Sequence, residues 1–487
     1  MSVVRRLAKN AAVLLTAQVI SYLLAFFYTI YAARYLGPAN YGIINFAVAF
    51  NGIFSILADF GLQQITVRDV SRNKELALKY ITNVSLLKVI MIIITYGLIA
   101  FTINHLGYPL ETIVVVYIIG LSVAFSAMSQ FFYGIFQAFE KMELQGIGQI
   151  VNALIMLSGV IIAVKYQWSL VQFATLYAIS SFCVLIYSLA TIRWGLKYNE
   201  AQRKIYRPRL DWEMWKDILK NAWPIGIVSG TITLYFRIDV LMLRAMKGDV
   251  AVGLYTVAHG LMELTLIIPA MLMVSVFPLM CQYYTSAQKS LNRAYEKSIK
   301  YLIAIALPVA LLVTMLSDNI IVIIYGDQFY GASNALRVLI WAAVFIYIGA
   351  VTGNMFIATN RQRTYLILAI IALVTNVVLN LVLIPSLSYI GASATKIFNE
   401  AIGLIIGLYV FHRMGYKLDV INVFMPTMLA FILACAVAVL LMKLGINIYI
   451  ISTAVLLTYA GLAYILGIKE DDKQLVKELF AKYKTFN

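Results

Sequence analysis

Charged side chains stand inside several long apolar stretches, and their types indicate which chemistry the chain could carry out. Four of them are cations: Arg34, Lys88, Arg237 and Lys396. An ionisable residue inside a membrane span is costly, so it is a candidate functional residue by default. These four cations are our candidates for binding an anionic substrate in a cavity.

Arg237 is the strongest of the four candidates. It lies roughly two turns from the outer end of a span that also contains Pro224 and Gly226. Asp239 is only two positions away and points elsewhere on a helix, so it does not neutralise Arg237 by simple geometry. We therefore predict that Arg237 faces a cavity.

Each of the other cations has an alternative role. Lys88 lies about two turns from the cytoplasmic end of its span, so it lines a cavity or snorkels to the headgroups. Arg34 is near the outer end of its span, which favours an interfacial or structural role. Lys396 is four residues before Glu400, on the same helix face, so the two form an internal salt bridge or contact the substrate.

Acidic groups and a histidine in the same stretches are candidates for coupling transport to an ion gradient. His259 and Glu263 are spaced four apart and could act as a protonatable pair, and an acidic residue could instead cap a helix or pair within its own half. No further Cys, His or acidic ligand clusters nearby, so we expect neither a metal site nor a cofactor. The candidates for ion coupling are Asp59, Asp239, His259, Glu263 and Glu400.

The composition indicates a membrane protein. The hydrophobic fraction is 62%, only 12% of the residues are charged and the mean hydropathy is +0.87. A soluble domain is about half apolar and about a quarter charged. The first apolar stretch, about residues 9–35, is too long for a signal-peptide core, so we expect it to be retained.

The apolar sequence divides into fourteen predicted spans of an all-α protein. Their approximate ranges are 9–35, 41–67, 80–104, 112–138, 145–165, 170–194, 218–244, 250–282, 298–317, 332–358, 364–385, 389–411, 420–442 and 446–467. With a cytoplasmic N-terminus, most Lys and Arg residues fall on the cytoplasmic side, as the positive-inside rule requires. We expect a multi-pass protein of the cell membrane with both termini cytoplasmic. This placement also explains the net charge of +16 without nucleic-acid binding.

A short internal repeat predicts two related halves. Residues 36–47 and 247–258 align so that Gly37 and Gly42 match Gly248 and Gly253. Six predicted spans separate the two copies, so the halves enter the membrane in the same orientation, as parallel repeats do in many transporters. The predicted divisions are a six-helix lobe (1–196), a basic cytoplasmic linker (197–217), a second six-helix lobe (218–413), an extra helix pair (414–467) and a basic amphipathic tail (468–487).

Sequence motifs argue against an enzyme. No phosphate-binding loop, nucleophile elbow or H-E-x-x-H zinc motif is present. A membrane glycosyltransferase or polymerase would need a sizeable soluble loop to hold its sugar donor, and the predicted outer loops are very short. We expect a transporter that carries out no covalent chemistry.

The N-terminal motifs resemble those of a known family. Ala33-Arg34-Tyr35-Leu36-Gly37-Pro38, Tyr41-Gly42, Asp59-Phe60-Gly61-Leu62, Arg68-Asp69 and Ser71-Arg72 resemble the opening of the prokaryotic polysaccharide flippases. These are the Wzx-like O-antigen and repeat-unit transporters of the multidrug/oligosaccharidyl-lipid/polysaccharide superfamily. The span count and the linker between the halves match as well.

The resemblance implies a function. Such flippases move polyprenyl-diphosphate-linked oligosaccharides from the cytoplasmic to the outer leaflet by alternating access, for surface polysaccharide biosynthesis. It implies membrane lipids as surroundings, and a polysaccharide polymerase and glycosyltransferases as partners in the pathway. A cation-coupled multidrug antiporter and a lipid II flippase share this architecture and are the alternatives, although the two extra spans favour a lipid-linked substrate over a drug.

Overall fold

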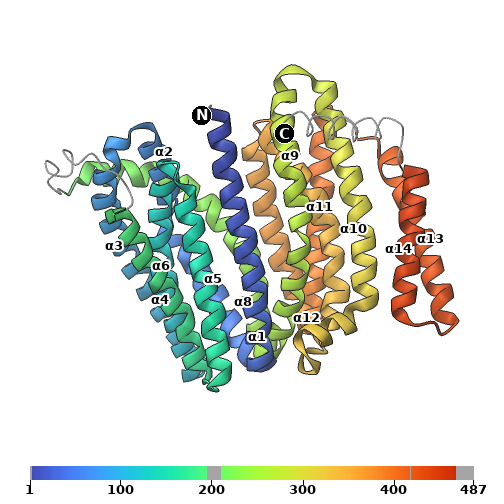
Figure 1. The fold of residues 1–487 in the computed structure, drawn as a ribbon, viewed down its shortest axis with the longest axis horizontal. Helices are drawn as coiled ribbons and strands as arrows, with labels where there is room; N and C mark the ends of the chain where they lie inside the picture. Colours follow the sequence, from blue (N-terminus) through green and yellow to red (C-terminus); the bar gives the residue numbers. More distant parts are fainter. Residues whose placement is uncertain (1–2, 195–209, 417, 468–487) are drawn as a thin grey trace. The chain divides into compact units, whose positions relative to one another are not determined.

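The computed structural model describes residues 3–194, 210–416 and 418–467, and these residues form helices and no strands (Figure 1). The predicted tail 468–487 and most of the predicted linker lie outside the described residues. The helices are α1 (Val3–Asp59), α2 (Leu62–Arg72), η1 (Lys74–Leu76), α3 (Ala77–His105), α4 (Leu110–Ala138), α5 (Met142–Lys165), α6 (Leu170–Trp194), α8 (Trp212–Thr265), α9 (Ile267–Ser286), α10 (Gln288–Tyr325), η2 (Asp327–Phe329), α11 (Ala332–Ala358), α12 (Gln362–Arg413), α13 (Val420–Lys443) and α14 (Ile448–Gly467).

The predicted all-α membrane fold is confirmed. Eleven helical stretches in the described part of the chain are long and apolar enough to cross a membrane. Three of them contain one residue with non-helical backbone angles: Gly37 in α1, Gly248 in α8 and Ser388 in α12. Each of these stretches has the length of two crossings, which agrees with the fourteen predicted spans.

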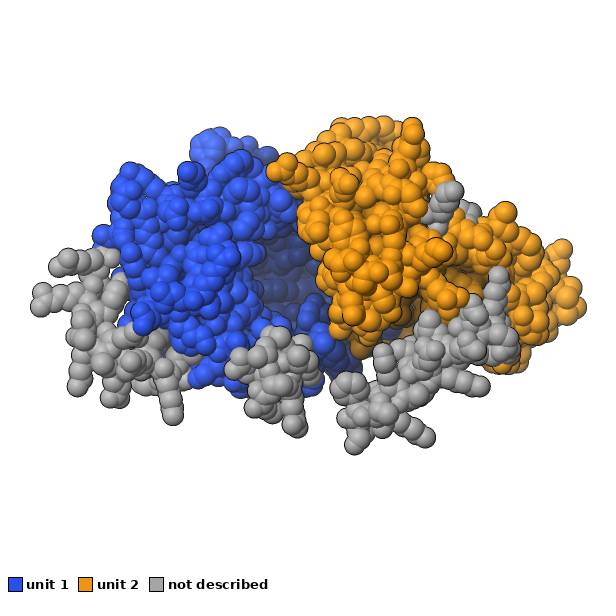
Figure 2. Space-filling view, turned by 90° about the horizontal axis from the view of Figure 1, so that it is seen from above, with its two compact units in different colours: residues 1–256, 324–329 blue, residues 257–323, 330–487 orange. Residues whose placement is uncertain are grey.

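The chain forms two compact units, drawn in blue and orange in Figure 2. Unit 1 comprises Met1–Thr256 and Ile324–Phe329, and unit 2 comprises Val257–Ile323 and Tyr330–Asn487. The boundary between the units therefore falls inside α8, after Gly248 and near the end of the second copy of the repeat (247–258). Compact units and sequence repeats are different divisions of a chain, so the lobe boundaries at 197–217 stay a prediction.

Three prolines in the helices leave a backbone carbonyl without its usual partner, because proline has no N–H to donate to the carbonyl four residues earlier. In a membrane such a carbonyl needs another donor, since lipid offers none. At all three a side chain from a distant element donates instead. For Pro38, Gln328 donates to the Arg34 carbonyl (2.6 Å); for Pro269, Tyr347 donates to Thr265 (2.6 Å); for Pro308, Tyr459 donates to Ala304 (3.0 Å).

Removing one of these donors should destabilise the fold. Tyr347→Phe and Tyr459→Phe should each lower the free energy of unfolding by about 1 kcal/mol, because the carbonyl is left unsatisfied in apolar surroundings. Thermal unfolding of the purified protein in detergent measures the effect. Tyr464→Phe is the matched control, since Tyr464 is an exposed residue of α14. Equal unfolding temperatures for Tyr459→Phe and Tyr464→Phe would contradict this account.

Candidate functional site

The two copies of the glycine repeat meet each other in unit 1. A β-carbon placed on Gly42 would lie 1.9 Å from the carbonyl oxygen of Asp249, and one placed on Gly253 would lie 2.0 Å from that of Pro38. Each glycine thus presses against the backbone of the other copy, directly beside the kink at Gly248 or Gly37. The kinked helices α1 and α8 cross here at a separation that only glycine allows.

The contact between these helices continues along their length. A β-carbon on Gly230 would lie 3.2 Å from the Ile56 side chain, and one on Gly226 would lie 3.1 Å from Phe60. Gly226 and Gly230 are four residues apart and so share one face of α8, which is the small-residue spacing of closely packed membrane helices. The second arm of α1 therefore packs antiparallel to α8. We refer to residues 38–61 of α1 with residues 222–253 of α8 as the glycine seam.

Arg237 lies in the middle of the glycine seam. Its Nε is 3.7 Å from the position that a β-carbon on Gly52 would take, so the side chain packs over a glycine of α1. The side chain is exposed, and within the described residues its guanidinium has no ion-pair partner. Asp239 is 2% exposed and accepts a hydrogen bond from the Tyr255 hydroxyl (3.1 Å). The two charges face different surroundings, as their spacing predicts.

Lys88 and Asp59 form a buried ion pair in unit 1. The Lys88 Nζ donates to Asp59 Oδ1 at 2.7 Å and to the Ala127 carbonyl at 2.8 Å, and its side chain is fully buried. Asp59 is the last residue of α1, directly before the positive-φ residues Phe60 and Gly61. The pair joins α1, α3 and α4 where α1 ends. The snorkelling alternative for Lys88 is wrong, because its ammonium is inside the protein.

Breaking this pair should cost far more than breaking an exposed one. Lys88→Met should lower the free energy of unfolding by about 3 kcal/mol, because it leaves the Asp59 charge without a partner. The double variant Lys88→Met with Asp59→Asn should regain part of the loss. Lys79→Met is the matched control: Lys79 pairs with Asp211 at 2.6 Å, but both side chains are about one-third exposed. If thermal unfolding shows that Lys88→Met is as stable as Lys79→Met, the buried pair does not contribute the expected stability.

Arg34 holds a loop of unit 1. Its Nε donates to the Ile324 carbonyl at 2.7 Å, and its own carbonyl accepts the bond from Gln328. Both bonds attach residues 324–329 to α1 just before the kink at Gly37. These contacts support the structural role that its position at the end of a span favours.

The two pairs predicted in unit 2 are both present. Lys396 Nζ lies 3.3 Å from Glu400 Oε1, with the lysine side chain buried and the carboxylate partly exposed. His259 Nδ1 lies 3.5 Å from Glu263 Oε1, and the Glu263 side chain is 54% exposed. The internal salt bridge predicted for Lys396 is thus confirmed, while any contact of these residues with substrate stays a prediction.

Two groups of polar residues were missed by sequence reasoning. Asn376, Asn380 and Asn399 are buried in α12, the helix of Lys396. Amides in mid-span are a signal that could have identified them. Arg244, the last residue of the predicted span 218–244, was also missed.

Arg244 is enclosed on all sides in unit 1. Its guanidinium carbon lies 3.8 Å from the ring centre of Phe46 and 4.4 Å from that of Tyr108. Its Nε lies 2.6 Å from Asp249 Oδ1, and Nη2 donates to Thr112 Oγ1 at 3.0 Å. Cation–π contacts of a desolvated Arg are stabilising. Arg244 therefore fixes α8, just before its kink, to α1 and to the start of α4.

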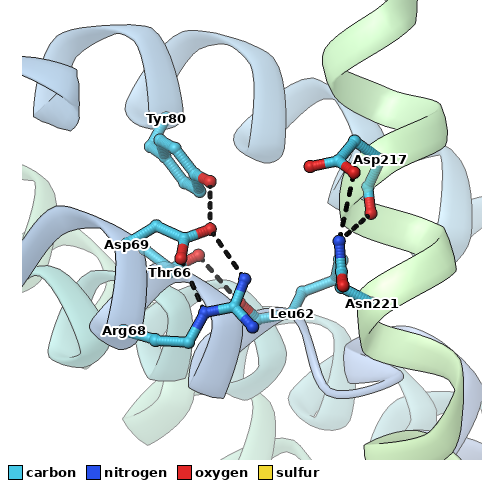
Figure 3. A network of polar contacts seen from close by, with 7 residues as sticks. All are labelled: Leu62, Thr66, Arg68, Asp69, Tyr80, Asp217 and Asn221. Carbon is cyan, nitrogen blue, oxygen red and sulfur yellow. Dashed lines mark hydrogen bonds and ion pairs between the residues drawn. The ribbon is translucent and has the colours of Figure 1, made fainter.

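The Arg68-Asp69 motif belongs to a polar network at the end of unit 1 (Figure 3). Arg68 Nε donates to Asp69 Oδ1 at 2.6 Å, and the Tyr80 hydroxyl donates to Asp69 Oδ2 at 2.7 Å. Asp69 thereby joins α2 to α3. Beside it, Lys79 donates a hydrogen bond to the Asp211 carboxylate, and this bond lowers the pKa of Asp211. Asp211 caps the start of α8, because its carboxylate accepts a hydrogen bond from the Met214 N–H (3.0 Å). The network positions helices and presents no reactive group.

Comparison with known proteins identifies the family. A family model described as "Polysaccharide biosynthesis protein" matches residues 7–284, more than half of the chain. The chain belongs to this family. A second model, MatE, matches residues 224–382. The predicted relationship to the polysaccharide flippases of the superfamily is confirmed.

Relatives of this polysaccharide biosynthesis protein cover most of its length. The "Capsular polysaccharide biosynthesis protein CapF" of Staphylococcus aureus is 23% identical over 84% of this chain and 100% of its own. The "Probable low-salt glycan biosynthesis flippase Agl15" of Haloferax volcanii is 24% identical over 82% of each chain. Both similarities therefore extend over more than four-fifths of each protein.

Solved structures share the fold. "Lipid II flippase MurJ, inward closed conformation" aligns with a TM-score of 0.73 and 16% identity, over 93% of this chain and 98% of that chain. An inward-facing multidrug resistance MATE family transporter of the MOP superfamily aligns with a TM-score of 0.64 and 18% identity, over 83% and 98%. At this identity the likeness concerns the fold alone. Among the described residues of our protein, no group of His, Cys, Asp and Glu side chains could hold a metal ion.

Proposed function

We propose that this protein is a flippase that moves polyprenyl-diphosphate-linked oligosaccharides from the cytoplasmic to the outer leaflet of the cell membrane. The observation that carries the proposal is the family match over residues 7–284, together with a capsular polysaccharide relative matched over its whole length. The many membrane-spanning helices agree with it. The chain carries out no covalent chemistry in this proposal and works by alternating access, with both termini cytoplasmic.

The diphosphate is the part of such a substrate that most needs the protein. It carries negative charge into surroundings of low dielectric, where charge-assisted hydrogen bonds from a cation offset the lost hydration. Three of the four predicted cations already have bonds: Lys88 to Asp59, Lys396 to Glu400, and Arg34 to a backbone carbonyl. Arg237 remains available on the glycine seam. We propose that it binds the diphosphate, and Lys88, Arg34 and Lys396 become secondary candidates.

Ion coupling is best assigned to His259 and Glu263. Asp59 and Glu400 each have a lysine partner, and Asp239 is buried with the Tyr255 hydroxyl on it. His259 Nδ1 and Glu263 Oε1 lie 3.5 Å apart and the Glu263 side chain is more than half exposed, so the pair offers two adjacent groups that can hold a proton. We propose that protonation of the pair accompanies transport.

The proposed place in the pathway follows from the substrate. Glycosyltransferases must assemble the lipid-linked unit on the cytoplasmic side, and a polymerase must consume it after it has crossed. Lipid II flipping is the second candidate, because the MurJ fold aligns over 93% of the chain and the Bacillus subtilis lipid II flippase MurJ is 21% identical over 90% of it.

Deleting the gene tests the function. The deletion strain should accumulate lipid-linked oligosaccharide on the cytoplasmic leaflet and lose most of its surface polysaccharide, and a plasmid copy should restore both. Extraction of the glycolipid, with leaflet labelling of its sugars, makes the measurement. Normal surface polysaccharide would overturn the proposal. In that case, cell lysis with trapped lipid II would favour the second candidate, and dye efflux by the purified protein would favour an antiporter.

A further inference from the structure

A polar pocket lies at one end of unit 2, where three connections between helices meet. Its volume is about 320 Å³, and it lies in the part of the chain from the end of α9 to the connection between α12 and α13. Ligand pockets begin at about this size. The lining residues are Tyr284, Gln288, Thr359, Arg361, Met414 and Tyr416.

The charge in this pocket is positive. Arg361 is the single charged residue among the lining residues, and no carboxylate lines the pocket. In the described part of the chain, the Arg361 side chain has no ion-pair or hydrogen-bond partner. Arg361 also precedes the first turn of α12, which has no side-chain cap, and Gln288 is the first residue of α10. The N-terminal ends of two long helices therefore add positive partial charge.

Tyr416, a largely buried residue, provides a donor for a ligand. The residue is 6% exposed, and its ring packs at 5.9 Å from that of Phe411. Its hydroxyl makes no hydrogen bond to another residue that the structure describes. Burial raises the pKa of Tyr416, so the hydroxyl keeps its proton and can donate it to a ligand oxygen. The side chain is largely buried while the residue lines the pocket, so its hydroxyl is available to a ligand there.

The C-terminal ends of two helices at the pocket carry negative partial charge, but their carbonyl groups are already hydrogen-bonded. α11 and α12 both end at the pocket. After each helix a backbone N–H donates to a carbonyl group of the last turn, so that carbonyl already has a partner. The Arg361 N–H donates to the Phe356 carbonyl at 2.8 Å, and the Tyr416 N–H donates to the Phe411 carbonyl at 3.0 Å. Schellman-type bonds of this kind satisfy the carbonyl groups. The groups left for a ligand are then the guanidinium, hydroxyls and an amide, which suit an anion with several oxygens.

We propose that this pocket binds a phosphate group, either that of a membrane lipid headgroup or free phosphate. A guanidinium and a hydroxyl are matched donors for phosphate oxygens. The pocket lies among helix ends rather than inside a span, and the ends of membrane-spanning helices lie at the depth of the lipid headgroups. Lys289 and Arg413 lie at helix ends beside these connections and raise the local concentration of anions. The site is separate from the glycine seam and does not depend on which glycolipid is transported.

Lipid binding by the full-length protein tests the site. The purified, delipidated protein is titrated with phosphatidylglycerol, with zwitterionic phosphatidylcholine, and separately with inorganic phosphate, and adducts are counted by native mass spectrometry. Arg361→Gln should weaken binding of the anionic probe about tenfold, and Tyr416→Phe should weaken it by a smaller factor. Arg363→Gln is the matched control, because it removes the same charge two residues away without touching the pocket, and its affinity should equal that of wild type.

The outcomes separate the two sources of phosphate. Arg361-dependent binding of phosphatidylglycerol supports a headgroup site, and Arg361-dependent binding of inorganic phosphate alone supports a free phosphate site. No binding of either probe, or an equal loss in Arg361→Gln and Arg363→Gln, would overturn the proposal, since equal losses indicate diffuse surface charge. Thermal unfolding confirms that each variant is folded. If Arg361→Gln does not fold, Tyr416→Phe decides the matter, because wild-type affinity in that variant contradicts the site.

Discussion

Alanine at Gly42 or Gly253 should remove most of the folded protein. Each added β-carbon would lie about 2 Å from a backbone carbonyl oxygen of the opposite helix, where no side chain can move aside. The helices α1 and α8 must then separate, which disturbs the whole glycine seam and should cost about 3 kcal/mol or more. Fluorescence-detected size-exclusion chromatography and thermal unfolding in detergent measure the loss.

Gly97→Ala is the matched control for these variants. A β-carbon on Gly97, in α3 of the same unit, meets nothing within 4 Å, so this change should be neutral or slightly stabilising. The double variant of Gly42 and Gly253 should lose less than the sum of the two single losses, because either alanine already opens the same crossing. Wild-type stability in Gly42→Ala would show that the helices do not approach as closely as described.

Loss of the Arg237 guanidinium should abolish most transport without unfolding the protein. Arg237→Ala should lower the flipping rate about 100-fold, since the proposed site would lose two or more charge-assisted bonds to the diphosphate. Arg237→Lys should retain part of the rate, because the charge stays while the planar pair of donors is lost. Surface polysaccharide in the complemented deletion strain, at matched protein abundance, gives the measurement.

Two variants separate this role from folding. Arg193→Ala removes an exposed cation at the end of α6 and should leave transport unchanged. Gly52→Ala places a methyl group 3.7 Å from the Arg237 Nε, an ordinary contact distance, so it should be tolerated. Full transport by Arg237→Ala at wild-type abundance would assign the residue a structural role and would require another group to bind the diphosphate.

Much of the fold could be predicted because apolar length and local breaks are properties of the sequence itself. The predicted boundaries at 35–41, 244–250 and 385–389 each contain the residue where the helix kinks, Gly37, Gly248 and Ser388. Glycine at two of these positions is required because the backbone angle φ is about +70 to +80°, which other residues adopt rarely.

The site was less predictable because its partners come from separate helices. The pairs spaced four residues apart in one helix, such as Lys396 with Glu400, follow from helical geometry. The Lys88–Asp59 pair joins residues of two different helices, and no local pattern indicates which helices adjoin. Arg244 has partners from α1, α4 and α8 and from the α3–α4 connection, so its enclosure required the tertiary structure.

The donors that serve the proline-freed carbonyls have an evolutionary consequence. Tyr347 is needed for the Thr265 carbonyl because Pro269 cannot donate to it, and Tyr459 stands in the same relation to Pro308. In a homologue that replaces the proline with a residue bearing an N–H, the helix can satisfy that carbonyl itself, and selection on the distant hydroxyl is relaxed. Proline and tyrosine at these positions should therefore be gained and lost together among homologues, so each pair forms one inherited unit across positions far apart in the chain.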